Sequence, residues 1–192
     1  IIREGDSIIL KYEQQNRTMT RSYRSVVTLQ AKLEELCGDS IVQPYREPLR
    51  IESCPVMIRS LWQRDQTQKW QEAAVLLMLG QPGSLTYQGA TAGLVERYSS
   101  LLQRGLGKRY EATRYQLTNL GQVTVDLLNQ RVHGLGELAI DFVLTASGDI
   151  QLKTVSTTAG LASVWKLTTP TVAQAVVSRT LAYAAALGEK QN

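Results

Sequence analysis

Two residues with the chemistry to bind an anion or a cation occur within apolar runs of the sequence. Arg59 follows Pro55-Val56-Met57-Ile58, and Asp141 lies in Glu137-Leu-Ala-Ile-Asp-Phe-Val-Leu144. An arginine in such a run can bind a phosphate through two parallel hydrogen bonds, or can pair with a glutamate on a neighbouring strand. Asp141, taken alone, can equally be a strand-end carboxylate that accepts a hydrogen bond from a turn.

Other residues that often take part in chemistry have simpler explanations here. The glycine-rich stretch from 80 to 93 is predicted as a loop, which could hold a phosphate by its backbone N–H groups or could merely connect two strands. His133 follows a predicted helix and precedes glycine, a position that favours a helix cap over catalysis. Cys37 and Cys54 form no CxxC pair, so we expect free thiols and a reducing compartment.

The composition is that of an ordinary globular protein with a mild positive charge. The net charge is +4 and the sequence pI is about 9.1, which fits binding of an anion such as a nucleotide. The basic residues are spread along the chain, so we expect no specific nucleic-acid binding. The longest apolar stretch, from 73 to 79, is too short to span a bilayer, and nothing resembles a signal peptide. We therefore expect a cytoplasmic protein that does not bind membranes; its first residue, Ile1, suggests a piece of a longer chain.

Hydrophobic periodicity predicts the elements that must position these residues. Alternating or continuous apolar runs predict strands over 7–12, 18–24, 41–43, 56–62, 70–79, 137–144 and 150–155. Helical spacing predicts helices over 26–36, 94–106, 111–132 and from Thr169-Pro170 to 187, with Ser25 capping the first. The order predicts an α+β fold with a mostly antiparallel sheet flanked by helices.

The segment from 137 to 160 resembles the last core hairpin of ATP-grasp enzymes. Both have an apolar-Asp-apolar strand, a glycine turn at Gly148 and a second apolar strand followed by a small-residue loop ending Ala159-Gly160. Upstream segments resemble one subfamily, the bacterial endospore coat-associated (YheC/YheD-like) proteins. They are the hinge-like strand Ile41-Val42-Gln43-Pro44-Tyr45, the Arg59 strand, the Trp70 strand, the glycine-bounded loop from 80 to 93, and the opening strand Ile1-Ile2-Arg3.

This resemblance implies a site for ATP and magnesium that has lost most of its ligands. Asp141 matches the first metal ligand, whereas Thr154 replaces the usual Glu, Ser156 replaces the usual Asn, and Met57 replaces an Asp. The resemblance makes Gln43, Arg59 and Asp141 vestigial nucleotide-binding residues, with Asp141 also the vestigial metal ligand. We expect Asp141, Thr154 and Ser156 on one sheet face, lining a cleft opposite Arg59. We expect no cofactor. If the ancestral activity is retained, we expect ATP and magnesium.

Three hypotheses follow for the function. The first is a degenerate, non-catalytic ATP-grasp-like protein that serves as a binding or structural component, with protein partners in a spore-coat assembly. The second is an active ATP-dependent ligase that joins a carboxylate to an amine or thiol, for which Glu137 is the reserve carboxylate. The third is an unrelated α+β binding module.

The resemblance also predicts the domain organisation. Residues 1–192 would form one ATP-grasp-like domain without its N-terminal part. Within it, 1–45 would be the end of the nucleotide-clamping subdomain and 46–192 the core sheet and helices.

Overall fold

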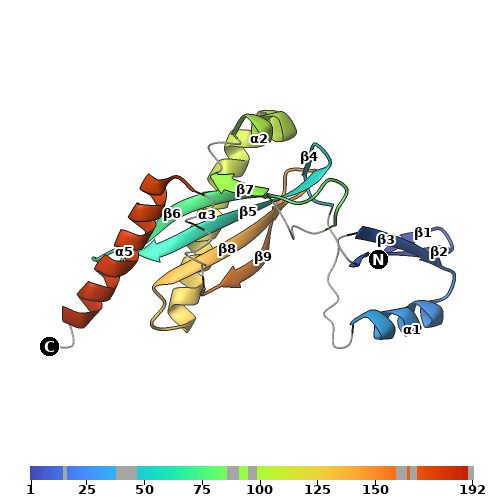
Figure 1. Cartoon of the computed structure of the whole chain (residues 1–192), viewed down its shortest axis with the longest axis horizontal. Coiled ribbons are helices and arrows are strands. Elements are labelled where there is room, and N and C mark those ends of the chain that lie inside the picture. Colours follow the sequence, from blue (N-terminus) through green and yellow to red (C-terminus); the bar gives the residue numbers. More distant parts are fainter. Residues whose placement is uncertain are drawn as a thin grey trace.

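The computed structural model describes residues 1–14, 17–37, 47–85, 91–94, 99–158, 164 and 168–189. Its first part is a small antiparallel sheet in the order β1-β2-β3, built from β1 (Ile2–Glu4), β2 (Ser7–Gln14) and β3 (Arg17–Tyr23). Helix α1 (Val26–Cys37) lies beside this sheet and contacts β2 and β3 (Figure 1). The predicted cap is confirmed, because the backbone N–H of Val27 donates to Oγ of Ser25 over 3.2 Å.

A second, larger sheet makes up the core, and β5 (Cys54–Arg64) is its central strand. The strand order is β7-β6-β5-β8-β9, with β4 (Arg50–Ile51) also pairing with β5. The other strands are β6 (Trp70–Leu79), β7 (Thr91–Leu94), β8 (Glu137–Leu144) and β9 (Ile150–Ser156). Every neighbouring pair is antiparallel, so the predicted α+β fold with an antiparallel sheet is confirmed.

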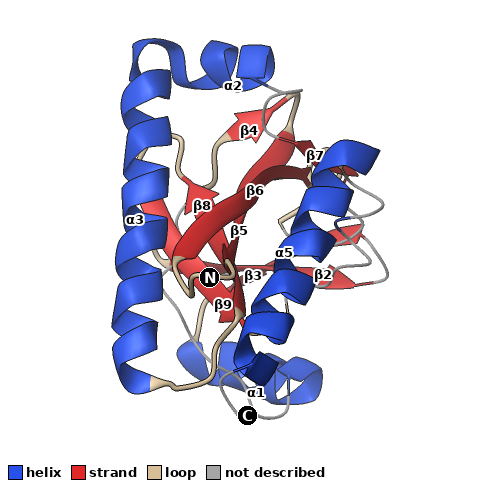
Figure 2. Ribbon diagram, turned by 90° about the vertical axis from the view of Figure 1, so that its left-hand side faces the viewer, coloured by secondary structure: helices blue, strands red, loops and turns tan. Residues whose placement is uncertain are grey.

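Helices cover both faces of this sheet. Helix α2 (Ser99–Leu106), the short η2 (Gly107–Arg109) and α3 (Tyr110–Arg131) pack on one face, and α5 (Pro170–Glu189) packs on the other (Figure 2). We call these the α3 face and the α5 face. No helix among the described residues is both long and apolar enough to cross a membrane.

The side chains of β5 alternate between these two faces, as strand geometry requires. Ile58 and Trp62 join core clusters with residues of α2 and α3. Leu61 joins a different cluster that contains Val176 of α5. Arg59 therefore points to the α5 face and its neighbour Ser60 points to the α3 face.

Two sequence predictions were wrong around residue 94. The stretch from 80 to 93 is not all loop, because residues 91–94 form β7, which pairs with Leu76–Leu79 at the edge of the sheet. Leu94, the first residue of the predicted helix over 94–106, belongs to β7, and the described helix α2 spans Ser99–Leu106. The spacing of nearby apolar residues placed Leu94 in the helix. Its observed partner is Leu76 of β6, and hydrophobic periodicity within a short window does not reveal such a pairing between strands.

Gly121 allows α3 to approach the sheet closely. A Cβ atom at this position would lie 2.8 Å from Cζ2 of the buried Trp62. We expect Gly121→Ala to lower the free energy of unfolding by about 1–3 kcal/mol because of this overpacking, although alanine favours a helix by about 1 kcal/mol. Urea unfolding followed by circular dichroism measures the change.

Gly105 in α2 is the matched control, because a Cβ there would meet Leu49 at an ordinary 3.5 Å. We expect Gly105→Ala to leave stability unchanged or to raise it by up to about 1 kcal/mol. A Gly121→Ala variant as stable as Gly105→Ala would contradict the close packing of α3 on Trp62.

Candidate functional site

Three of the residues singled out from the sequence lie side by side on the α5 face. In the strand register Arg59 of β5 is opposite Asp141 of β8, and Asp141 is opposite Thr154 of β9. Ser156 is opposite Ala139, two residues further along the same face. The structure therefore gathers Asp141, Thr154 and Ser156 as expected, but it places Arg59 on the neighbouring strand and not across a cleft.

Arg59 holds both oxygens of the Asp141 carboxylate. Its Nε donates to Oδ1 over 2.7 Å and its Nη2 donates to Oδ2 over 2.8 Å. The Asp141 side chain is only 8% exposed and that of Arg59 is 27% exposed. These hydrogen bonds raise the pKa of the Arg59 guanidinium above its usual value, although partial burial acts in the opposite direction. The pair is a bidentate, charge-assisted contact between adjacent strands.

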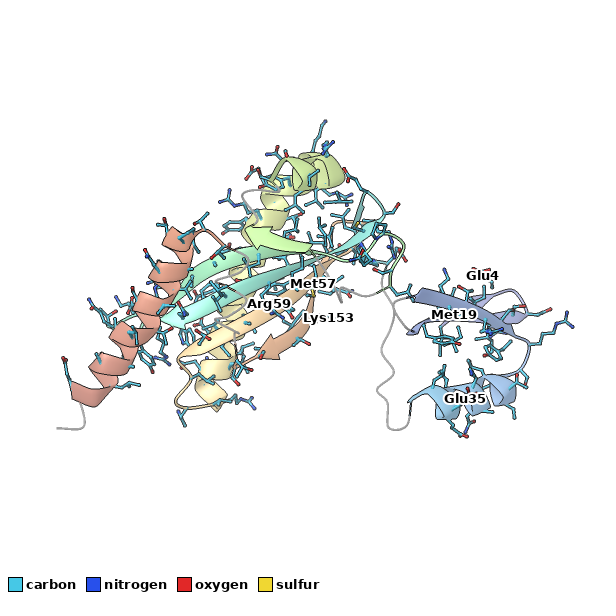
Figure 3. All side chains as sticks on the ribbon, viewed as in Figure 1. Glu4, Met19, Glu35, Met57, Arg59 and Lys153 are labelled. Carbon is cyan, nitrogen blue, oxygen red and sulfur yellow. The ribbon has the colours of Figure 1, made fainter. Side chains whose placement is uncertain are left out.

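A β-bulge in β9 decides which residue faces Asp141. The register passes from Phe142 opposite Leu152 to Asp141 opposite Thr154, so Lys153 is the extra residue. Without the bulge Lys153 would be opposite Asp141, and Thr154 would point to the α3 face. Figure 3 shows Met57 and Arg59 on β5, and Lys153 at the bulge.

Among the described residues, neither hydroxyl of β9 forms a hydrogen bond with the Asp141 carboxylate. Thr154 is exposed. The Ser156 hydroxyl takes part in a local turn, where it donates to the Thr158 carbonyl over 3.1 Å and accepts from the Thr158 N–H over 3.2 Å. These contacts are typical of serine at the end of a strand.

A family model for YheC/D-like ATP-grasp proteins matches residues 1–187. The chain belongs to the YheC/D-like ATP-grasp family. No curated protein matches the sequence significantly. The resemblance noted in the sequence is thus confirmed over nearly the whole chain.

ATP-grasp proteins generally use ATP and magnesium. Mg²⁺ prefers negatively charged oxygen ligands. At the hairpin Asp141 is the one carboxylate among the three matched positions, and a guanidinium already occupies both of its oxygens. In the described part of the chain no group of three or more His, Cys, Asp or Glu residues could hold a metal ion. Among the described residues, the hairpin thus offers a magnesium ion a single carboxylate, which Arg59 already holds.

Of the other positions in the resemblance, one is buried in the core and three lie outside the described residues. Met57, which stands where the family has an Asp, is 5% exposed and lies opposite Met78 and Val143. It is therefore an apolar core residue on the α5 face. Gln43, Ala159 and Gly160 lie outside the described residues.

Glu137, the reserve carboxylate, is engaged in a separate network at the far end of β8. The Gln63 side-chain amide donates to Glu137 over 2.7 Å and to Thr180 of α5 over 2.9 Å. Glu137 and Asp141 are four residues apart on one strand, which corresponds to about 13 Å. This network links α5 to the sheet. The sequence did not predict it, because Gln63 belongs to no motif or pattern that indicates such a role.

The structure also contains a groove between the two sheets, which the sequence did not predict. It has a volume of about 270 Å³ and is lined by Lys11 and Thr20 of the small sheet and by Glu47 and Arg50 near β4. Lys11 and Thr20 are opposite each other in the register of β2 and β3. The Arg50 Nε donates to Glu47 over 2.9 Å, so one of the two cations here already has a carboxylate partner.

The Arg59–Asp141 pair should contribute strongly to stability, because removing one partner leaves the other charge partly buried. In a double-mutant cycle with Arg59→Met and Asp141→Leu, we expect a coupling free energy of about 2–4 kcal/mol, measured by urea unfolding. A coupling below about 0.5 kcal/mol would contradict the observed pairing.

The Glu47–Arg50 pair is the matched control. Its Nε to Oε1 distance is similar, 2.9 Å, but the Glu47 side chain is 55% exposed. Exposed pairs contribute less than about 1 kcal/mol, so a cycle with Arg50→Met and Glu47→Leu should give a much smaller coupling than the Arg59–Asp141 cycle.

Proposed function

We propose that this chain is a degenerate ATP-grasp protein that does not catalyse ligation and acts as a binding or structural component. The observation that supports this most strongly is the bidentate contact between Arg59 and Asp141. In an ATP-grasp enzyme the matching carboxylate would hold a metal ion. Here Arg59 holds both oxygens of that carboxylate, and the neutral Thr154 and Ser156 stand at the other two ligand positions.

The chemistry of the neighbouring positions supports the same proposal. A second cation near Asp141 would need further negative charge, but the residue opposite it is the neutral Thr154. Displacing Arg59 from Asp141 would leave a guanidinium without a partner on a partly buried surface, which is costly. The apolar Met57, 5% exposed, adds no ligand on the neighbouring part of β5.

This proposal predicts that the chain binds Mg-ATP weakly and that restoring the family residues raises its affinity for Mg-ATP. By calorimetric titration, we expect no micromolar binding of Mg-ATP to the parent chain. The double variant Thr154→Glu and Ser156→Asn places a second carboxylate opposite Asp141, so we expect it to bind Mg-ATP at least about tenfold more tightly. Micromolar affinity in the parent would contradict the proposal.

Two further variants make this test specific. The pair Thr157→Glu and Thr158→Asn introduces the same two residue types but lies beyond the end of β9, so it should give no gain. Adding Asp141→Ala to the Thr154→Glu, Ser156→Asn variant should remove the gain, because both carboxylates would act on one ion. Circular dichroism confirms that each variant is folded.

We also propose that the chain is made in the cytoplasm and acts in a spore-coat assembly through protein partners. This proposal rests on the resemblance to endospore coat-associated proteins. It predicts that the chain, produced in a spore-forming bacterium during sporulation, is recovered with the insoluble coat fraction of purified spores on an immunoblot. Recovery only in the soluble fraction of the mother cell would contradict the proposed location.

A further inference from the structure

A small cavity lies on the α3 face, between the sheet and the helices that cover it. It has a volume of about 120 Å³ and is lined by residues of β5, β6 and β8 on one side and of α2 and α3 on the other. Most of its wall is apolar and comes from one core cluster and the residues packed against it, namely Ile58, Val75, Leu102, Leu106, Leu117 and Leu144. Because Arg59 points to the opposite face of β5, the cavity is independent of the proposed function.

A β-bulge in β6 turns Glu72 toward this cavity, where its carboxylate is already engaged. Ala73 is the extra residue of the bulge. Ser60, which is 2% exposed, donates its hydroxyl proton to Oε1 of Glu72 over 2.6 Å. The other charged residue of the wall, Arg114, is exposed on α3, where water solvates it. Within the described part of the chain, the cavity therefore presents no charge that is neither engaged nor solvated, which favours an uncharged ligand.

A buried threonine in the same wall has an unused hydroxyl. Thr113 of α3 is 3% exposed and lines the cavity. Its hydroxyl makes no hydrogen bond among the described residues, whereas the hydroxyls of Thr124 and Thr180 each donate to the carbonyl four residues earlier in their helices. Buried polar groups normally have a partner, so a hydroxyl without one calls for a ligand or an ordered water at that place. Thr113 thus gives an otherwise aliphatic cavity one directional donor.

We propose that this cavity binds a small uncharged molecule with an apolar body and a single carbonyl oxygen. Thr113 would donate its hydroxyl proton to that oxygen, and the aliphatic wall would surround the rest of the molecule. A cavity of about 150 Å³ holds benzene, so this smaller one has room for roughly five non-hydrogen atoms. A short-chain ketone meets both limits. Water fits less well, because an ordered water needs several polar partners and most of this wall is aliphatic.

Titration of the full chain with 2-butanone, followed by ¹H–¹⁵N NMR, tests this site. We expect saturable shifts of the amides of Ile58, Val75 and Thr113, with a dissociation constant of roughly 1–10 mM. The matched probe is 2-methyl-1-butene, which has the same shape but carries a methylene group in place of the oxygen. It should also bind, because the wall is apolar, but its affinity should not depend on the Thr113 hydroxyl.

The variant Thr113→Val isolates the role of the hydroxyl. It keeps the shape of the side chain but removes the donor, so it should weaken 2-butanone by about three- to tenfold and should not weaken 2-methyl-1-butene. The control is Thr124→Val, on the same helix but outside the cavity, which should leave the affinity for both probes unchanged.

Three results would overturn the proposal. Absence of saturable shifts with 2-butanone in the parent chain is the first, and it needs no variant. Equal affinity for 2-butanone in the parent and in Thr113→Val is the second. Urea unfolding without any probe supplies the third, because replacing an unpartnered buried hydroxyl by a methyl group should raise the unfolding midpoint. A lower midpoint in Thr113→Val would mean that the hydroxyl already has a partner within the fold.

Discussion

Strand β5 is hydrogen-bonded on both edges and covered on both faces, and the rest of the core depends on this position. Because its side chains alternate between two covered faces, its arginine, serine and glutamine side chains need partners within the fold. Arg59 finds Asp141, Ser60 finds Glu72 and Gln63 finds Glu137. Each contact joins β5 to a different strand or end of a strand, so together they fix the register of the central three strands.

Two β-bulges determine which chemistry each face presents. The extra residue Lys153 in β9 brings Thr154 opposite Asp141 on the α5 face. The extra residue Ala73 in β6 brings Glu72 to the α3 face, beside Ser60. A bulge interrupts the ladder locally, and both occur next to a carboxylate. The sheet therefore separates a carboxylate paired with a guanidinium on one face from a carboxylate facing a cavity on the other.

The ATP-grasp family supplies the hairpin architecture, and the individual residues decide what this architecture can bind. The hairpin has the strand aspartate and the glycine turn on which the resemblance rests. The residues opposite Asp141 are Arg59 on β5 and the neutral Thr154 on β9, and of these two only Thr154 departs from the pattern of the resemblance. On this hairpin the strand carboxylate forms an ion pair with Arg59 of the neighbouring strand.

The sequence by itself determined most strands, most helices and the family. The strands over 70–79 and 137–144 were predicted with their observed bounds, because apolar patterning and flanking turn residues are local signals. Tertiary structure alone decided the pairing of β7 with β6, both bulges and the partner of Arg59. From the sequence Arg59 had two open roles, a phosphate or an acidic neighbour, and its partner lies 82 residues away. Such contacts follow from how strands align in a sheet, and local periodicity contains no information about that alignment.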